Sequence, residues 1–215
     1  MKAKIFSDQL SVDSRLNQLG LSRDVFRNVM QTMKMAWNST TENYPNGSSG
    51  ILSWMLGTNK IREQLLKLGW QRDTLGNVSW VLNPSMGIRI AILNADDAVC
   101  ALDRFPQPRS RKGAATESAI SSNQQFLAEI LSSSLNEALS EENSAQWYFC
   151  CFCDGEQVRG ELSLPTGFSN GYFTRFAERI FVGTDDGSNP SDKVRKHTPD
   201  TGTDFEIPVI RKKAM

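Results

Sequence analysis

Histidine is almost absent from this chain, and net charge is absent altogether. The 215 residues include one histidine, His197, and a lone imidazole argues against the paired ligands and bases of most zinc sites and nucleophilic centres. The 24 Lys and Arg residues balance 24 Asp and Glu residues, so the formal net charge is zero. No field of the whole molecule therefore attracts nucleic acid or an anionic lipid surface, and such a partner has to be met by a local patch.

Long apolar runs are missing as well. No stretch approaches the roughly 20 apolar residues of a membrane span, and the opening "MKAKIFSDQLSVD" lacks the apolar segment of a secretion signal. We therefore expect a cytoplasmic protein with no membrane partner.

Cysteine is scarce and clustered, since three of the four cysteines fall in the run "WYFCCFC". The spacing of Cys150, Cys151 and Cys153 does not match the paired knuckles of a zinc site, and the only histidine, His197, is remote. Alternation along a strand would place Cys151 and Cys153 on one face and Cys150 on the other. We expect four reduced thiols that pack as small apolar groups.

Apolar residues suffice for a core, because they make up 39% of the chain, with eleven Phe and five Trp. Trp54, Trp70, Trp80 and Trp147 fit core positions, and any of them that is exposed would suit an anchor for a partner.

Helical spacing of apolar residues dominates the first 70 residues. The stretch 11–38 predicts a helix, a break at Gly20 and a second, amphipathic helix, with Ser22 as its N-cap. Helical spacing resumes between Ile51 and Leu68. Taken alone, "LGLSRDVF" is also compatible with a helix-turn-helix, in which Ser22, Arg23, Arg27 and Asn28 would face the DNA major groove.

Period-two patterns follow from residue 78 onward. They predict a hairpin near 78–94 with the turn "NPSMG", and a second hairpin near 146–164 with the turn "DGE". Between them, apolar residues at three- and four-residue steps predict a long helix over 114–140. For residues 172–183 the pattern fits a helix or a strand equally.

These elements predict the α+β class, with a helical N-terminal third packed on a mainly antiparallel sheet and one long helix across the sheet. We expect a single domain over 1–215, with helices in 1–70 and the sheet plus long helix in 71–183. The Gly-, Asp-, Ser- and Pro-rich stretch 184–203 predicts a mobile loop. The apolar, extended residues 204–215 predict a last strand or tail that could add to the sheet of another chain.

The motifs "GILSWMLGTNKIREQLLKLGW", "GIRIAILNADD", "RKGAATESAISSNQ" and "ELSLP" followed by "ERI" together resemble a family of uncharacterised bacterial proteins. The resemblance spans most of the chain. It implies a bacterial origin and a single fold, and it transfers no catalytic residue, cofactor or partner.

A basic loop joins the predicted strand to the long helix. It holds Arg104, Arg109, Arg111 and Lys112 within nine positions and is followed by Gly113. The first amides of a helix and its dipole favour an anion, and a glycine there lets the anion approach the backbone. The spacing matches neither the P-loop nor the dinucleotide fingerprint. The loop therefore suits a phosphate cradle or a solvated connector.

Carboxylates form the other candidate site. Asp96 and Asp97 close a buried strand, which is a position where metal-dependent phosphotransfer enzymes often hold a ligand. Glu161 and Glu178 could complete such a cluster. Asp at a strand end is equally a common turn former.

The first functional expectation is a non-enzymatic bacterial cytoplasmic protein that contacts nucleic acid or another phosphate-bearing partner through the basic loop, without a cofactor. The alternative is an adaptor or accessory subunit that acts through protein–protein contacts. A metal-dependent phosphodiesterase or nuclease is the third expectation.

Overall fold

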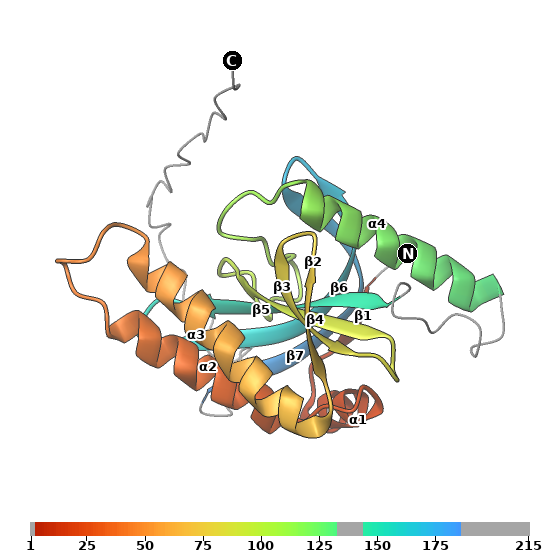
Figure 1. Ribbon diagram of the computed structural model, residues 1–215, viewed down its shortest axis with the longest axis horizontal. Coiled ribbons are helices and arrows are strands. Elements are labelled where there is room, and N and C mark those ends of the chain that lie inside the picture. The colour runs from red at the N-terminus through yellow and green to blue at the C-terminus, as the bar shows by residue number, and fades with distance from the viewer. Residues whose placement is uncertain (1–2, 133–143, 186–215) are drawn as a thin grey trace, which may run out of the picture.

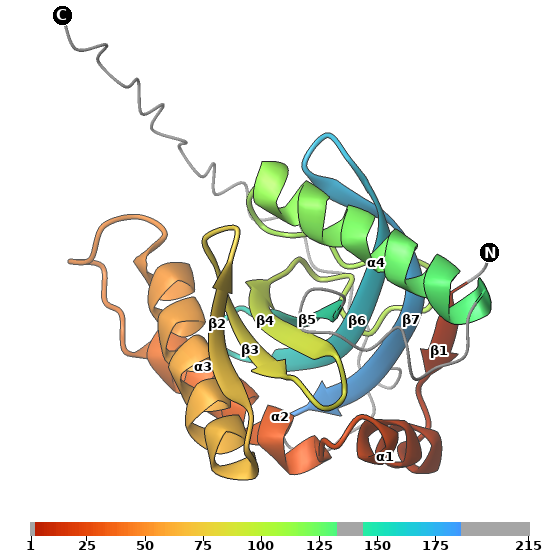
Figure 2. The same cartoon turned by 45° about the vertical axis from the view of Figure 1, so that its right-hand side comes forward.

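A seven-stranded sheet forms the centre of the computed structural model, which describes residues 3–132 and 144–185. The strands lie in the order β1-β7-β6-β5-β4-β3-β2, and Figures 1 and 2 show them as a twisted, curved layer. Their bounds are Lys4–Phe6 (β1), Gln71–Leu75 (β2), Val78–Asn83 (β3), Ile88–Asn94 (β4), Ala145–Cys153 (β5), Val158–Ser169 (β6) and Tyr172–Thr184 (β7).

The sheet is mixed. The pairs β2/β3, β3/β4, β5/β6 and β6/β7 are antiparallel, whereas β4/β5 and β1/β7 are parallel. The parallel pairing at the centre of the sheet joins residue Ile88 to Ala145 and continues to Asn94 beside Cys151. The predicted α+β class is confirmed, and the ambiguous residues 172–183 are a strand.

Helices α1 (Gln9–Gln18), α2 (Arg23–Asn38) and α3 (Ser48–Leu65) pack against one side of this sheet, and α4 (Ala114–Ser132) crosses β5 and β6 on another. A short 3-10 turn, Leu66–Leu68, extends α3. The predicted long helix thus begins at the expected residue. Its expected end at 140 lies outside the described residues.

The larger core cluster lies between α1–α3 and the sheet. Phe26 of α2 packs on Phe149 of β5, with ring centroids 4.7 Å apart. A Cβ at Gly160 would lie 2.4 Å from Phe149 and 2.8 Å from Met30, so α2 approaches β6 closely because this position lacks a side chain. Ile90, on the central strand β4, is fully buried.

A second, aromatic cluster covers the opposite side. Trp80 lies edge-on to Tyr148 with ring centroids 5.2 Å apart, and Phe173 contacts both Tyr148 and Phe176. Ala119 and Ile120 of α4 join this cluster, while Phe126 further along α4 belongs to the first cluster. β5 is buried along its whole length, because both clusters use its side chains.

The cysteines follow the same division. Cys151 and Cys153 belong to the first cluster and Cys150 to the second, which confirms the expected alternation. All four cysteines are free and buried.

Three of the four residues that the helix-turn-helix interpretation assigned to DNA have partners within the helices. Ser22 precedes α2 as expected, but Arg23 pairs with Asp13 of α1 at 2.8 Å and Asn28 donates to Gln64 of α3 at 2.9 Å. Arg27 lies 3.6 Å from Asp24 within α2 itself. Arg23 and Asn28 therefore link α2 to its neighbours, whereas the Arg27 pair lies within α2 and Ser22 makes no side-chain cap.

Three of the four tryptophans singled out above, Trp70, Trp80 and Trp147, are buried, and Trp54 is partly exposed on α3. Thr184 ends β7 and Asp185 lies in a turn beside it, whereas the rest of the expected mobile loop and the expected strand at 204–215 lie outside the described residues. No helix in the described part of the chain is both long and apolar enough to cross a membrane.

Candidate functional site

The loop that carries the predicted basic residues, 95–113, leaves β4 and returns beside it. Ala95 and Pro108 form an isolated antiparallel bridge, and the Arg109 amide donates to the Asn94 carbonyl at 3.1 Å. The Asp96 amide donates to the Gln107 carbonyl at 2.9 Å. The two arms of the loop are thus paired at its base, which places the stretch between them over the second cluster.

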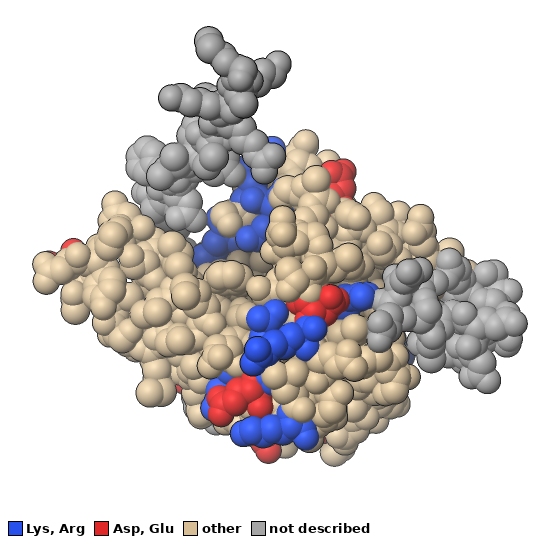
Figure 3. All heavy atoms as spheres, viewed as in Figure 1, with Lys and Arg blue, Asp and Glu red and all other residues tan. Residues whose placement is uncertain are grey.

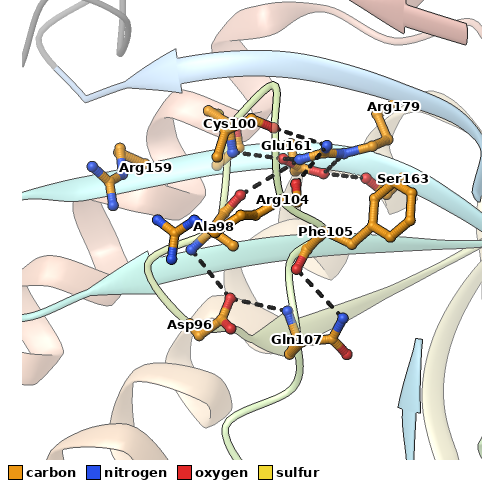
Figure 4. A network of polar contacts seen from close by, with 12 residues as sticks. Asp96, Ala98, Cys100, Arg104, Phe105, Gln107, Arg159, Glu161, Ser163 and Arg179 are labelled. Carbon is orange, nitrogen blue, oxygen red and sulfur yellow. Dashed lines mark hydrogen bonds and ion pairs between the residues drawn. The ribbon is translucent and has the colours of Figure 1, made fainter. Parts of the chain in front are cut away.

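Asp96 closes the base of this loop. Its carboxylate accepts the amides of Ala98 at 3.2 Å and Gln107 at 3.0 Å (Figure 4). Burial raises the pKa of Asp96, while these two amide hydrogen bonds oppose the rise. Of the two interpretations of Asp96, metal ligand and turn former, these contacts support the turn former.

A fully buried ion pair, Glu161 with Arg179, holds the loop on the sheet. The two side chains extend from β6 and β7, and Arg179 donates Nε to Glu161 Oε1 at 2.8 Å and Nη2 to Oε2 at 2.7 Å (Figure 4). Glu161 also accepts the Cys100 amide at 2.6 Å and the Ser163 hydroxyl at 2.6 Å. Both carboxylate oxygens are therefore occupied.

The remaining donors of Arg179 reach backbone carbonyls of the loop. Nη1 donates to the carbonyls of Ala101 at 2.9 Å and Arg104 at 3.0 Å, and Nη2 lies 3.5 Å from that of Ala98. The guanidinium carbon lies 4.8 Å from the centroid of the Phe181 ring. Arg179 therefore links β7 to three points of the loop, and the pair has no donor or acceptor left for a ligand.

The proposed metal ligands do not come together. Asp97 pairs with Arg104, Glu161 with Arg179, and Glu178 with Arg15. Across residues 3–132 and 144–185, no three His, Cys, Asp or Glu side chains meet in a group that could hold a metal ion. The carboxylates form ion pairs within the fold instead. Their spacing in the sequence does not distinguish this role from metal binding.

Arg104 is separated from the other basic residues by its partner. Its guanidinium lies 3.1 Å from Asp97 on the exposed tip of the loop, and the Asp97 hydrogen bond raises the pKa of Arg104. The carboxylate neutralises this cation locally, so Arg104 contributes little to attraction of an anion.

Arg109 lies over two aromatic rings. Its guanidinium carbon lies 4.7 Å from the ring centroid of Trp37, at the end of α2, and 5.5 Å from that of Phe152 on β5. Nη2 donates to the Cys153 carbonyl at 2.6 Å and Nε to the Ala95 carbonyl at 3.3 Å. The residue thus joins the loop, α2 and the end of β5 while part of its side chain stays exposed.

Arg111 and Lys112 lie against the turn between β6 and β7. Arg111 Nε donates to the Asn170 carbonyl at 3.1 Å, and the Lys112 amide donates to the Gly171 carbonyl at 3.1 Å. Gly171 has a φ of +88°, and a Cβ there would lie 3.0 Å from Cβ of Arg111. The glycine turn therefore allows the basic segment to approach.

The backbone at Gly113, where α4 starts, is open. A Cβ at this position would meet no atom within 4 Å. The amides of Thr116 and Glu117 donate to the Gly113 carbonyl at 3.1 and 3.2 Å, so the amides of residues 113–115 precede the first hydrogen-bonded turn. They are the ones that an anion could approach.

Arg109 and Arg111 form no ion pair with any described carboxylate; their hydrogen bonds go to the carbonyls of Ala95, Cys153 and Asn170. The sequence analysis missed two residues that matter here, Arg179 and Trp37. A hairpin separates Arg179 from Glu161, and more than seventy residues separate Trp37 from Arg109. Only the assembled fold shows these contacts.

No protein-family model, curated protein or solved structure matches this chain. The interpretation of the site therefore rests on its geometry.

Proposed function

We propose that the surface formed by Arg109, Arg111, Lys112 and the start of α4 binds a phosphate-bearing partner, with nucleic acid as the first candidate. The observation that carries this proposal is that Arg109 and Arg111 stand at the surface with no described carboxylate paired to them, directly before an open helix N-terminus. Figure 3 shows Lys and Arg atoms gathered between α3 and the start of α4.

The physical reason is that charged side chains and the free amides of the helix act on the same anion. Guanidinium groups bind phosphate with charge-assisted hydrogen bonds, and the helix dipole adds a partial positive charge at the same end. Because the net charge of the chain is zero, this local excess of cations would orient an anionic partner on one face.

The residues differ in their expected parts. Arg109 is fixed by its two rings and two carbonyls, so it presents its exposed edge in one position. Arg111 and Lys112 supply the outer contacts. Arg104, paired with Asp97, is left out of the refined site.

A salt titration tests the proposal. Wild type and the variant R111A/K112A are titrated against a labelled duplex and a labelled single strand at two salt concentrations. The control variant K60A/K67A removes the same charge from α3 and the 3-10 turn that extends it, where both lysines flank Glu63. We expect R111A/K112A to weaken binding to every sequence and to reduce the salt slope by about two, because phosphate contacts do not discriminate bases.

The control variant should bind as wild type does. If wild type shows no binding at low salt, or if R111A/K112A keeps the affinity and the salt slope, the loop is a solvated connector. Binding of the duplex and the single strand with equal affinity would indicate that the backbone phosphates are the recognised group.

The proposed setting is a bacterial cytoplasm, and the proposed role is non-enzymatic. The four free, buried cysteines fit a reducing compartment. The acidic residues that could have served chemistry are engaged in ion pairs and backbone contacts, which supports a binding role.

The exposed side of α3 favours a second candidate, an adaptor that docks on another protein. Ile51, Trp54 and Met55 are 59%, 39% and 52% exposed, and the surface over this part of α3 is almost free of charge in Figure 3. Exposed aromatic and methionine side chains are typical anchors of protein interfaces.

Co-purification from the native host distinguishes this candidate. A stoichiometric partner retained by wild type should be lost with W54A/M55A and kept with L10A, which alters a still more exposed apolar residue on α1. Equal recovery with both variants would exclude the α3 face as the docking surface.

A further inference from the structure

A hollow of about 390 Å³ lies between α3 and the edge strand β2, apart from the basic loop. Its walls are formed by side chains of α3, the turn after it and β2, namely Met55, Thr58, Asn59, Arg62, Leu66 and Arg72. In Figure 3, Lys and Arg atoms and Asp and Glu atoms alternate across the part of the surface where the lower half of α3 meets the strands.

Arg62 is fixed in the wall of this hollow. Its Nη2 donates to the carbonyl of Trp80 at 3.0 Å and lies 3.4 Å from that of Asp73, so the guanidinium is tied to β2 and β3. Burial and the nearby charge of Arg72 lower the pKa of Arg62. Two like charges therefore face the same space, and an anion between them would relieve their repulsion.

No carboxylate neutralises this pair among the described residues. Glu63, which also borders the hollow, lies 3.2 Å from Lys60 and 3.8 Å from Lys67. Asp73 on β2 pairs with Arg89. The two acidic groups closest in the sequence to the arginines are thus engaged with other cations.

Two buried polar atoms of the wall lack a partner. Thr58 is 7% exposed, and its Oγ1 has no hydrogen-bond partner. The Nε of Arg62 has none either. Buried donors are nearly always satisfied in native proteins, so two unsatisfied donors on residues of the wall point to a group that completes them.

We propose that this hollow binds an oxyanion head group carried on an apolar body. Arg62 and Arg72 hold the oxyanion, Thr58 Oγ1 and Arg62 Nε supply donors, and Met55 and Leu66 contact the apolar body. Carboxylate and phosphate share this chemistry, since both match the donor geometry of guanidinium groups.

Benzoate and phenyl phosphate serve as probes of the two head groups, with benzyl alcohol as the neutral counterpart. Each is titrated into the full chain by calorimetry and by NMR. We expect saturable binding of at least one anion and no saturation by benzyl alcohol. The stronger of the two anions identifies the head group that the site prefers.

Two variants test the residues. R72Q removes an exposed cation that forms no ion pair with any described residue, and T58V removes one hydroxyl at nearly constant volume. Each should weaken binding of the preferred anion at least tenfold. K4Q, which removes an exposed cation from β1 at the opposite edge of the sheet, should leave it unchanged.

Absence of saturable binding by both anions overturns the proposal, as does unchanged affinity in R72Q. Equal binding of benzyl alcohol would also overturn it, because apolar contact alone would then explain the affinity. The R111A/K112A variant should bind the probes as wild type does, which keeps this site distinguishable from the basic loop.

Discussion

Glu161 and Arg179 form a bidentate ion pair whose two side chains are both fully buried, and Arg179 also donates to backbone carbonyls of the loop that covers it. Removing one member would leave the other charge buried without a partner, which costs far more than the net worth of the pair.

The variant R179M should lower the free energy of unfolding by about 3–5 kcal/mol, measured by urea denaturation. The double variant E161L/R179M should lose less than the sum of the two single variants, because no isolated charge remains. Strict additivity of the two losses would show that the residues act independently.

Ile90 tests the centre of the sheet. It is fully buried on β4, so I90A should cost about 2–5 kcal/mol through lost burial and a cavity. I51A, at an exposed position of α3, is the matched control and should change the free energy of unfolding by less than about 0.5 kcal/mol. An unchanged melting midpoint in I90A would contradict the position of this strand in the core.

Arg109 and Arg104 occupy the same loop but should differ in their effect on stability. R109A removes two carbonyl hydrogen bonds and a stacked guanidinium, and we expect a loss of about 1–2 kcal/mol. R104A breaks an exposed ion pair with Asp97 and should cost less than about 0.5 kcal/mol. Thermal unfolding of both variants measures the difference. Equal losses would mean that the Arg109 contacts contribute no more to stability than the exposed pair of Arg104 and Asp97.

The buried thiols should make stability depend on alkaline pH. Burial raises the pKa of Cys100, Cys150 and Cys151 in the folded protein, whereas an unfolded thiol has a pKa of about 8.5. The contribution of these thiols to the free energy of unfolding is complete below that pH. It is lost as the pH rises, because the unfolded chain releases its thiol protons at a lower pH than the folded protein does. The free energy of unfolding should then fall by up to about 1.4 kcal/mol per pH unit for each thiol.

Urea unfolding at pH 7.5 and pH 10 measures how steeply the free energy of unfolding falls with pH. The variant C151A should reduce this slope by the contribution of one thiol. Titration of the unfolded chain without reductant should count four thiols. A slope that C151A leaves unchanged, or a count of two, would contradict the assignment of buried, reduced cysteines.

Much of the fold follows from periodicity in the sequence. Alternating apolar residues identify β3 and β4, and the hairpin of β5 and β6 contains its "DGE" turn between Cys153 and Val158. The start of α4 and the N-cap of α2 also follow from local patterns. These elements carry a regular apolar period or their own turn chemistry, so a short window of sequence is sufficient.

The remaining elements depend on contacts that no window contains. β2, with the sequence "QRDTL", has only partly buried or exposed residues, so it carries no apolar pattern. Glu161 lies opposite Phe181, and Ser163 opposite Arg179, because register shifts interrupt the β6/β7 pairing. Counting residues outward from the hairpin turn would therefore not have paired Glu161 with Arg179. A role as a metal ligand remained a reasonable interpretation of Glu161.

The parallel pairing of β4 with β5 has a consequence for the order of folding. Neighbours in this pair are more than fifty residues apart in the sequence, and β1 at the start of the chain pairs with β7 near residue 180. Such distant contacts close large loops, which slows the search for the native state. On the ribosome, α1 to α3 would emerge long before the strands that cover their apolar sides, so the nascent chain should need protection until β7 is synthesised.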